Sequence, residues 1–138
     1  MVNITKYKKY RNGFGLYSIV HTVSKTSESL NNEYPNRTES NLDLVWKKMV
    51  IQGLEYALSK IHHIICIEII LKDIEGHIMH SNNYSMLAAG ILATFAELNV
   101  EIDEEDIENL YEFVESSKEK DLDAIPDVDK LVFKTYRI

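Results

Sequence analysis

Between residues 42 and 98 the spacing of hydrophobic and polar positions changes twice, and each change predicts a new element. Apolar residues from Leu42 to Ile61 recur at helical spacing with charged residues between them, which predicts an amphipathic helix. The segment His63 to Lys72 is rich in β-branched residues and apolar on both faces, which predicts a largely buried strand. The segment Tyr84 to Leu98 has almost no polar face, so we expect a helix that is covered on nearly every side.

Turn and cap residues separate these three elements. Asp73 to Gly76 has the composition of a turn, and His77 to His80 is expected to return as a short strand. The polar cluster Ser81 to Asn83 offers the N-cap of the apolar helix. In the amphipathic helix, Gly53 lies within the apolar stripe, where a missing side chain allows a close approach to a neighbour at a cost of about 1 kcal/mol in helix propensity.

Further elements are expected on both sides of this block. Gly15 to Val23 and Leu131 to Tyr136 are rich in β-forming residues and predict two more strands. The polar segment Ser24 to Asn41 is expected to be a mobile loop. Residues 101 to 129 are expected to be an acidic, mainly helical segment with a solvated face, since Asp103 to Asp106 suit a helix N-terminus.

Length and composition favour one intracellular domain. The 138 residues suit a single domain spanning 1–138, and 45% hydrophobic residues are enough for a core. No apolar run approaches the roughly 20 residues of a membrane span, and the polar start is unlike a signal peptide, so we expect a nuclear or cytoplasmic protein or both. The one cysteine, Cys66, lies in the predicted buried strand, which excludes an internal disulfide and fits a reducing compartment.

The net charge of −7 is unevenly distributed. Residues 1–12 hold four cations and no acid, whereas residues 101–129 hold thirteen acids and two lysines. The candidate RNA contacts are the four cations of the first segment, Lys6, Lys8, Lys9 and Arg11. Tyrosines lie between them, so the segment has groups that contact phosphates and stack on bases. The interpretation we favour from the sequence is nevertheless a solvated, basic N-terminal arm, because a broadly basic footprint is absent.

Residues that could carry chemistry are few. His77 and His80 are three positions apart, which on a strand places them on opposite faces and argues against a shared metal. Glu68 in the apolar strand is a candidate functional carboxylate, although a position at an edge or beside a lysine explains it equally well. The sequence contains no glycine-rich phosphate loop and no nucleophile elbow. We therefore predict no catalytic residue, no cofactor and no metal site.

The order of the segments resembles the RNase PH family over roughly residues 13 to 106. The matching segments are Gly15 to Thr22 for the early core strand, Glu33 to Pro35 for the acidic-x-proline segment of exosome members, Leu42 to Leu58 for the helix of the "EI..LI..AL" type, Ile65 to Lys72 for the "I.I.V.VL" strand and Ala88 to Ile102 for the following helix and its exit. The resemblance implies an α+β fold of the ribosomal protein S5 domain 2-like kind, a sheet packed with helices.

The same resemblance implies that activity is lost. Enzymes of the family bind phosphate through a Gly-Thr-Arg type segment, where this chain reads Gly76-His77-Ile78-Met79-His80 without arginine. Their later strand pair with a catalytic aspartate has no counterpart up to Ile138. The function implied is that of a non-catalytic structural subunit of an RNA exosome-like ring in RNA processing and degradation. Its partners would be related RNase PH-like subunits, with RNA bound weakly or only in the complex.

Two other functions stay open. Gln52 to Leu58 and Glu75 to Ser81 are similar to parts of domain IV of elongation factor G, which implies an RNA-binding or ribosome-binding module. The acidic segment 101–129 fits instead a small inhibitor or immunity protein that covers a basic nuclease.

Overall fold

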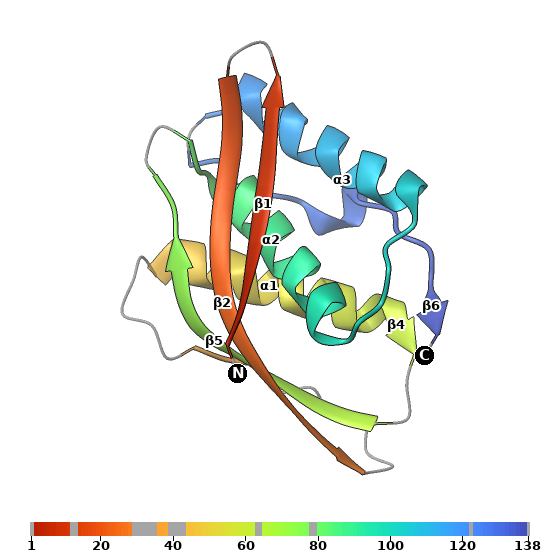
Figure 1. Cartoon of the computed structure of the whole chain (residues 1–138). Coiled ribbons are helices and arrows are strands. Elements are labelled where there is room, and N and C mark those ends of the chain that lie inside the picture. The colour runs from red at the N-terminus through yellow and green to blue at the C-terminus, as the bar shows by residue number, and fades with distance from the viewer. Residues whose placement is uncertain are drawn as a thin grey trace.

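The computed structural model describes residues 2–11, 14–28, 36–38, 44–62, 65–77, 80–121 and 123–137. The main elements are β1 (Asn3–Arg11), β2 (Phe14–Glu28), β3 (Asn36–Thr38), α1 (Leu44–Lys60), β5 (Ile65–Glu75), α2 (Asn83–Glu97) and α3 (Glu104–Glu115). In this part of the chain, three α-helices pack against a four-stranded sheet (Figure 1), which confirms the predicted α+β class. No described helix is long and apolar enough to span a membrane.

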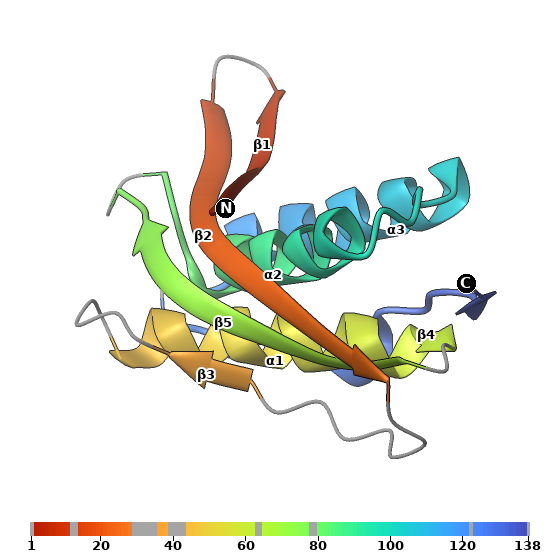
Figure 2. The same ribbon diagram turned by 60° about the horizontal axis from the view of Figure 1, so that its bottom comes forward.

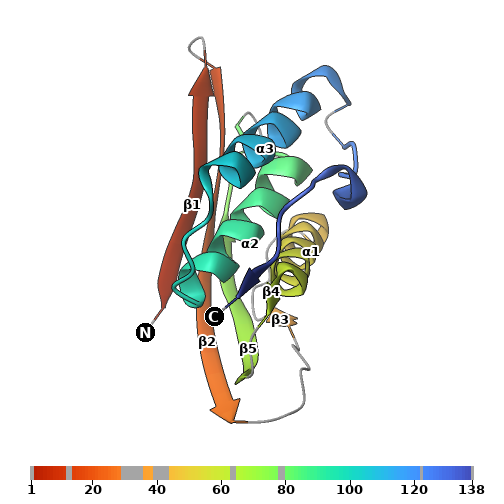
Figure 3. The ribbon, with the colours of Figure 1, turned by 90° about the vertical axis from the view of Figure 1, so that its right-hand side faces the viewer.

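The main sheet is mixed and has the strand order β1-β2-β5-β3. β1 and β2 form an antiparallel hairpin, β5 is antiparallel to β2, and β3 is parallel to β5. The β2–β5 register shifts between His21 and Thr22, and β2 turns near its middle so that the hairpin stands away from the rest of the sheet (Figure 2). Figure 3 shows the helices on one side of β1, β2 and β5, so that the opposite face of these strands is left uncovered by the described helices.

The remaining elements are short. β4 (Ile61–His62) and β6 (Tyr136–Arg137) form a separate two-stranded parallel sheet. Two 3₁₀ turns follow α3, η1 (Ser116–Glu119) and η2 (Val128–Lys130). α2 ends just before Asn99, whose φ of 54° places it in the left-handed region that Asn tolerates.

The amphipathic helix, the buried strand, the apolar helix and the acidic helix occur where the sequence predicts them, as α1, β5, α2 and α3. α1, β5 and α2 follow the predicted segments closely, and Asn82 caps α2 by accepting a hydrogen bond from the Ser85 amide at 2.9 Å. The turn predicted at Asp73 to Gly76 is wrong, because β5 continues to Glu75 with Ile74 buried opposite Val20. His77 and His80 are not in a strand either; the His80 amide donates to the His77 carbonyl in a turn.

The predicted strand from Leu131 to Tyr136 is also wrong. Only Tyr136–Arg137 is a strand, while Leu131 and Phe133 are buried in the core. The Tyr56 hydroxyl explains this conformation, since it donates to the Leu131 carbonyl at 2.6 Å and accepts from the Phe133 amide at 3.2 Å. A side chain of α1 thereby takes the backbone groups that a neighbouring strand would otherwise bind.

The segment expected to be a solvated N-terminal arm forms β1 instead. Tyr7 is only 1% exposed, and its ring lies edge-on to Tyr111 of α3 with 5.9 Å between ring centroids. This aromatic side chain packs the strand against the helix layer. Of the loop expected at Ser24 to Asn41, the start belongs to β2 and Asn36–Thr38 is β3, and the rest lies outside the described residues.

Two glycines allow α1 and α2 to approach within backbone contact. A Cβ atom on Gly53 would lie 2.1 Å from the Leu87 carbonyl oxygen, and one on Gly90 would lie 2.3 Å from the Val50 carbonyl oxygen. Real Cβ atoms do not come this close to backbone oxygens, so each glycine faces the backbone of the opposite helix. The close approach inferred for Gly53 from its place in the apolar stripe is confirmed.

A side chain at Gly53 is expected to separate the helices. Gly53→Leu should lower the free energy of unfolding by about 1 to 3 kcal/mol or more, because the inserted atoms overpack a backbone contact. Gly53→Ala serves where the leucine variant does not fold, and Glu55→Leu, on the exposed face of α1, is the matched control. Urea denaturation measures the free energy of unfolding of each variant. A Gly53→Ala protein more stable than the original by about 1 kcal/mol would contradict the contact, since alanine gives that full gain in helix propensity only where its Cβ meets no obstacle.

Candidate nucleic-acid interface

The uncovered face of β1 and β2 is defined by alternating burial. Along β2, Leu16, Ser18, Val20 and Thr22 are buried under the helices. The residues that alternate with them are half-buried on the uncovered face, namely Tyr17, Ile19, His21 and Val23. Along β1, Ile4, Lys6 and Lys8 are exposed while Tyr7 is buried. The period of two therefore places two lysines and a tyrosine on the same open surface.

Strand register brings the lysines beside the aromatic ring. Lys8 lies opposite Tyr17 and Lys6 opposite Ile19, and opposed residues of an antiparallel pair are within reach of each other's side chains. A shallow hollow of about 160 Å³ lies here, lined by Lys6, Tyr7, Lys8, Tyr17 and Ile19. A cationic strand beside an aromatic side chain is the combination that binds single-stranded nucleic acid.

The four candidate RNA contacts are not brought together. Lys6 and Lys8 lie on the uncovered face, whereas Lys9 points to the helix layer, where its ammonium group is 4.3 Å from the centre of the Tyr111 ring. The backbone of Arg11 ends β1, but its side chain lies outside the described residues. The structure therefore places two of the four candidate residues, Lys6 and Lys8, on one surface.

A row of three rings continues the surface beyond Tyr17. The Tyr17 ring stacks on the His80 ring, with 6.0 Å between centroids and 23° between planes. The His80 ring lies 5.4 Å from the His77 ring. The Tyr17 amide also donates to the His80 carbonyl at 2.6 Å. Sequence reasoning missed this association, because it depends on contacts between residues more than sixty positions apart, such as the Ser81 and Tyr17 pair at 64.

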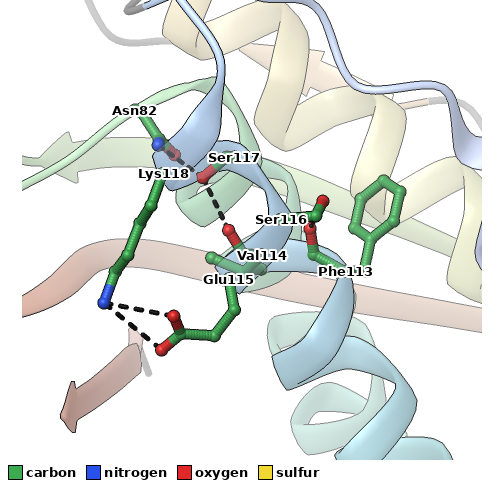
Figure 4. Close-up of polar contacts among 7 residues, drawn as sticks. All are labelled: Asn82, Phe113, Val114, Glu115, Ser116, Ser117 and Lys118. Carbon is green, nitrogen blue, oxygen red and sulfur yellow. Dashed lines mark hydrogen bonds and ion pairs between the residues drawn. The ribbon is translucent and has the colours of Figure 1, made fainter.

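Polar side chains hold the turn that carries His80. The Ser81 hydroxyl donates to the Tyr17 carbonyl at 2.5 Å and accepts from the His77 amide at 2.9 Å. The Asn82 side-chain amide donates to the Ser117 hydroxyl at 2.9 Å, and Ser117 donates to the Val114 carbonyl at 2.6 Å (Figure 4). The turn is thus tied to β2, to α2 and to the end of α3.

The acidic and basic side chains of the uncovered face lie on different strands, β5 and β1. On β5, Asp73 and Glu75 are exposed, and the Glu75 carboxylate lies 2.6 Å from Nε2 of His21. The cations of β1 lie at the other edge of the sheet. The exposed acids of α3 lie in the helix layer, namely Glu104, Glu105, Glu108 and Glu112. An acidic chain therefore still presents a basic strip along β1.

Glu68 and a larger groove are the other features of the described residues that could form a site. Glu68 is half-buried and lies opposite Lys25 in the strand register. No group of three or more His, Cys, Asp or Glu side chains in the described part could hold a metal ion. A larger groove of about 520 Å³ lies between α3 and the segment after it, over Tyr84 and Phe113. Its charged lining consists of two acids and two lysines, so it offers no excess charge for a phosphate chain.

A buried carboxylate at the start of α3 has a structural role that the sequence did not indicate. Asp106 is 4% exposed and accepts a hydrogen bond from the Tyr136 hydroxyl at 2.6 Å. The Asp103 amide donates to the same hydroxyl at 2.9 Å. Burial, together with the hydrogen bond to Asp106, raises the pKa of Tyr136. These contacts join the N-terminus of α3 to β6.

Comparison with known proteins shows a fold relative without showing a family. No family model and no curated protein matches this sequence. Among solved structures, the chain is similar to the crystal structure of ttk003000868 from Thermus thermophilus, with a TM-score of 0.53 and 14% identity. The match covers 85% of this chain and 20% of that chain, so this chain spans about a fifth of the length of its structural relative. At this identity the likeness shows the fold alone.

The buried tyrosine beneath the uncovered face predicts loss of stability in alkali. Burial, with smaller contributions from Tyr111 and Glu115, raises the pKa of Tyr7 above its ordinary value of 10.0. In the unfolded chain the Tyr7 phenol ionises near pH 10, whereas in the folded chain it stays protonated to higher pH. The contribution of this buried phenol to the stability of the folded state is therefore complete below pH 10 and is lost as the pH rises above it. The free energy of unfolding should fall by about 1 kcal/mol more per pH unit above pH 10 than in Tyr7→Phe. Urea denaturation at several pH values measures the difference, and equal slopes would contradict it.

Proposed function

We propose that this chain is a non-catalytic RNA-binding subunit of a larger RNA-processing assembly. The observation that carries the proposal is the juxtaposition of Lys6, Lys8 and Tyr17 on the uncovered face of β1 and β2. Lysines neutralise phosphates, and every base has a π-face that stacks on an aromatic ring, so such a surface binds unpaired RNA without reading its sequence. Single-stranded RNA would lie across the hairpin.

The arrangement of elements supports a ribosomal protein S5 domain 2-like fold, and more specifically an RNase PH-like one. Along the chain, three strands, a helix, a strand and a helix form the main sheet and the two helices packed on it. The structural likeness covers a fifth of a longer chain, so a similar fold forms one part of a larger protein there. A domain that works together with other domains or subunits agrees with this order of elements and with this partial coverage.

The sequence supports the non-catalytic part of the proposal. Phosphorolysis needs a cation on the attacking phosphate, and the segment from Gly76 to His80 contains no arginine or lysine. The rings of His77 and His80 lie in the row that begins at Tyr17. We therefore assign these histidines to binding.

The edge of the sheet favours an exosome-like ring as the assembly. In the described part of the chain, β1 pairs with β2 alone and is the outer strand, and it exposes 58% of Ile4. A long edge strand is a template for a strand of another subunit, and closed rings protect such edges. Related RNase PH-like subunits in the nucleus or the cytoplasm are the partners we propose.

The lysines are expected to dominate RNA affinity. Lys6→Glu/Lys8→Glu should weaken binding of fluorescein-labelled decauridylate about tenfold or more. Because two phosphate contacts are removed, the slope of log K against the logarithm of the salt concentration should become shallower by roughly 1.4. The control Lys48→Glu/Lys130→Glu makes the same change in net charge at two other exposed positions. Fluorescence anisotropy at low salt measures both variants. Equal losses in the two variants would indicate a long-range charge effect, and no binding by the original protein would refute the proposal.

The edge strand is expected to make the isolated chain self-associate. Sedimentation of the pure protein at several concentrations should show association that increases with concentration, and Ile4→Lys should reduce it, because a charge on an edge strand opposes pairing. Co-expression with a related RNase PH-like subunit should give a monodisperse complex instead. A well-behaved monomer that binds no such subunit would count against the ring.

A further inference from the structure

The row of rings formed by Tyr17, His80 and His77 lies at the end of the uncovered face, next to the lysines of β1. Tyr17 lies opposite Lys8 in the strand register and lines the same hollow as Lys6. His80 continues from Tyr17 at 6.0 Å, and His77 continues from His80 at 5.4 Å. Lysine side chains and aromatic rings are therefore arranged in order across one surface.

We propose that Tyr17, His80 and His77 form a base-stacking platform for unpaired RNA, an inference that rests on the proposed function. The phosphates of the bound strand lie over Lys6 and Lys8, and its bases stack on the row of rings. The ligand class is single-stranded RNA without a fixed sequence, because stacking needs only a π-face and not a particular pattern of donors and acceptors.

The surroundings of the row fix its position before a ligand arrives. Ser81 binds the backbone of both Tyr17 and His77, and the Tyr17 amide is bound to the His80 carbonyl. Asn82 and Asn83 tie the same turn to η1 and to the Ala124 carbonyl, the latter at 3.0 Å. Groups held in place by such contacts lose less conformational freedom on binding, which favours affinity.

Acidic side chains lie on the same face as the platform. The His21–Glu75 pair lies on the same face, and Asp73 is exposed beside it on β5. These acids repel phosphates, so the backbone of the strand is kept on the β1 side and its bases are directed to the rings. The split of charge on this face thus predicts the orientation of the bound strand.

Two probes separate stacking from charge. Decauridylate carries bases and phosphates, whereas linear polyphosphate of matched charge carries phosphates alone. Tyr17→Ala should weaken decauridylate binding about 5- to 100-fold, which corresponds to stacking of one base, and should leave polyphosphate binding within about twofold. Tyr17→Phe should bind both probes as the original does. Val23→Ala, which shortens another half-buried side chain of β2 on the same face, is the matched control.

A second readout guards against misfolding of Tyr17→Ala. His77→Ala changes an exposed residue and should weaken decauridylate binding about 2- to 5-fold, with no effect on polyphosphate. In the unaltered protein, the ring proton resonances of His80 should shift upfield on addition of decauridylate and not on addition of polyphosphate. Equal affinity for both probes, with no effect of Tyr17→Ala or His77→Ala, would overturn the platform and leave RNA binding through the lysines intact. Failure to bind either probe would instead overturn the proposed function.

Discussion

The backbone contact between α1 and α2 is the constraint on which the rest of the structure depends. Gly53 and Gly90 each face the opposite backbone, so the two helices lie against each other without intervening side chains. α2 is apolar on almost every side and needs neighbours all round. α1 covers one side, the sheet covers a second and α3 packs on a third. The layer order of the domain therefore follows from the composition of one helix and the absence of two side chains.

Polar contacts at both ends of α2 then fix the β1–β2 hairpin. Near the start of the helix the Ser18 hydroxyl donates to the Ser85 hydroxyl at 2.8 Å, and both groups are buried. At the end, Glu97 accepts hydrogen bonds from Thr22 at 2.7 Å and from Asn3 at 2.9 Å. The hairpin is thus held at two separated points, so the face that carries Lys6, Lys8 and Tyr17 keeps one orientation. A binding surface on strands fixed in this way is more precise than one on a loop.

Sequence reasoning found the elements whose pattern is strong by itself, and it missed those that depend on distant partners. The long apolar runs predict α1, β5 and α2, and the Asn82 cap has a local signal. β1 lacks such a signal, since only Tyr7 is a strong inward residue and its partner Tyr111 lies in the last long helix. Lys6 and Lys8 were identified from charge alone, but their association with Tyr17 needs the hairpin register. The spacing of His77 and His80 singles them out as a pair, but their association with Tyr17 has no signal in the sequence.

The segment from 123 to 137 has a consequence for how the chain folds. It closes the core through Leu131 and Phe133, and Tyr56 binds it across 75 and 77 positions of sequence. Contacts of such separation form late, because the entropy of closing long loops must be overcome before they add stability. The N-terminal part of α3, where Asp106 accepts a hydrogen bond from the Tyr136 hydroxyl, therefore stays open to water until this segment arrives. During synthesis, the α1–α2 pair can assemble first, and the N-terminus of α3 gains its contact with Tyr136 only after β6 has left the ribosome.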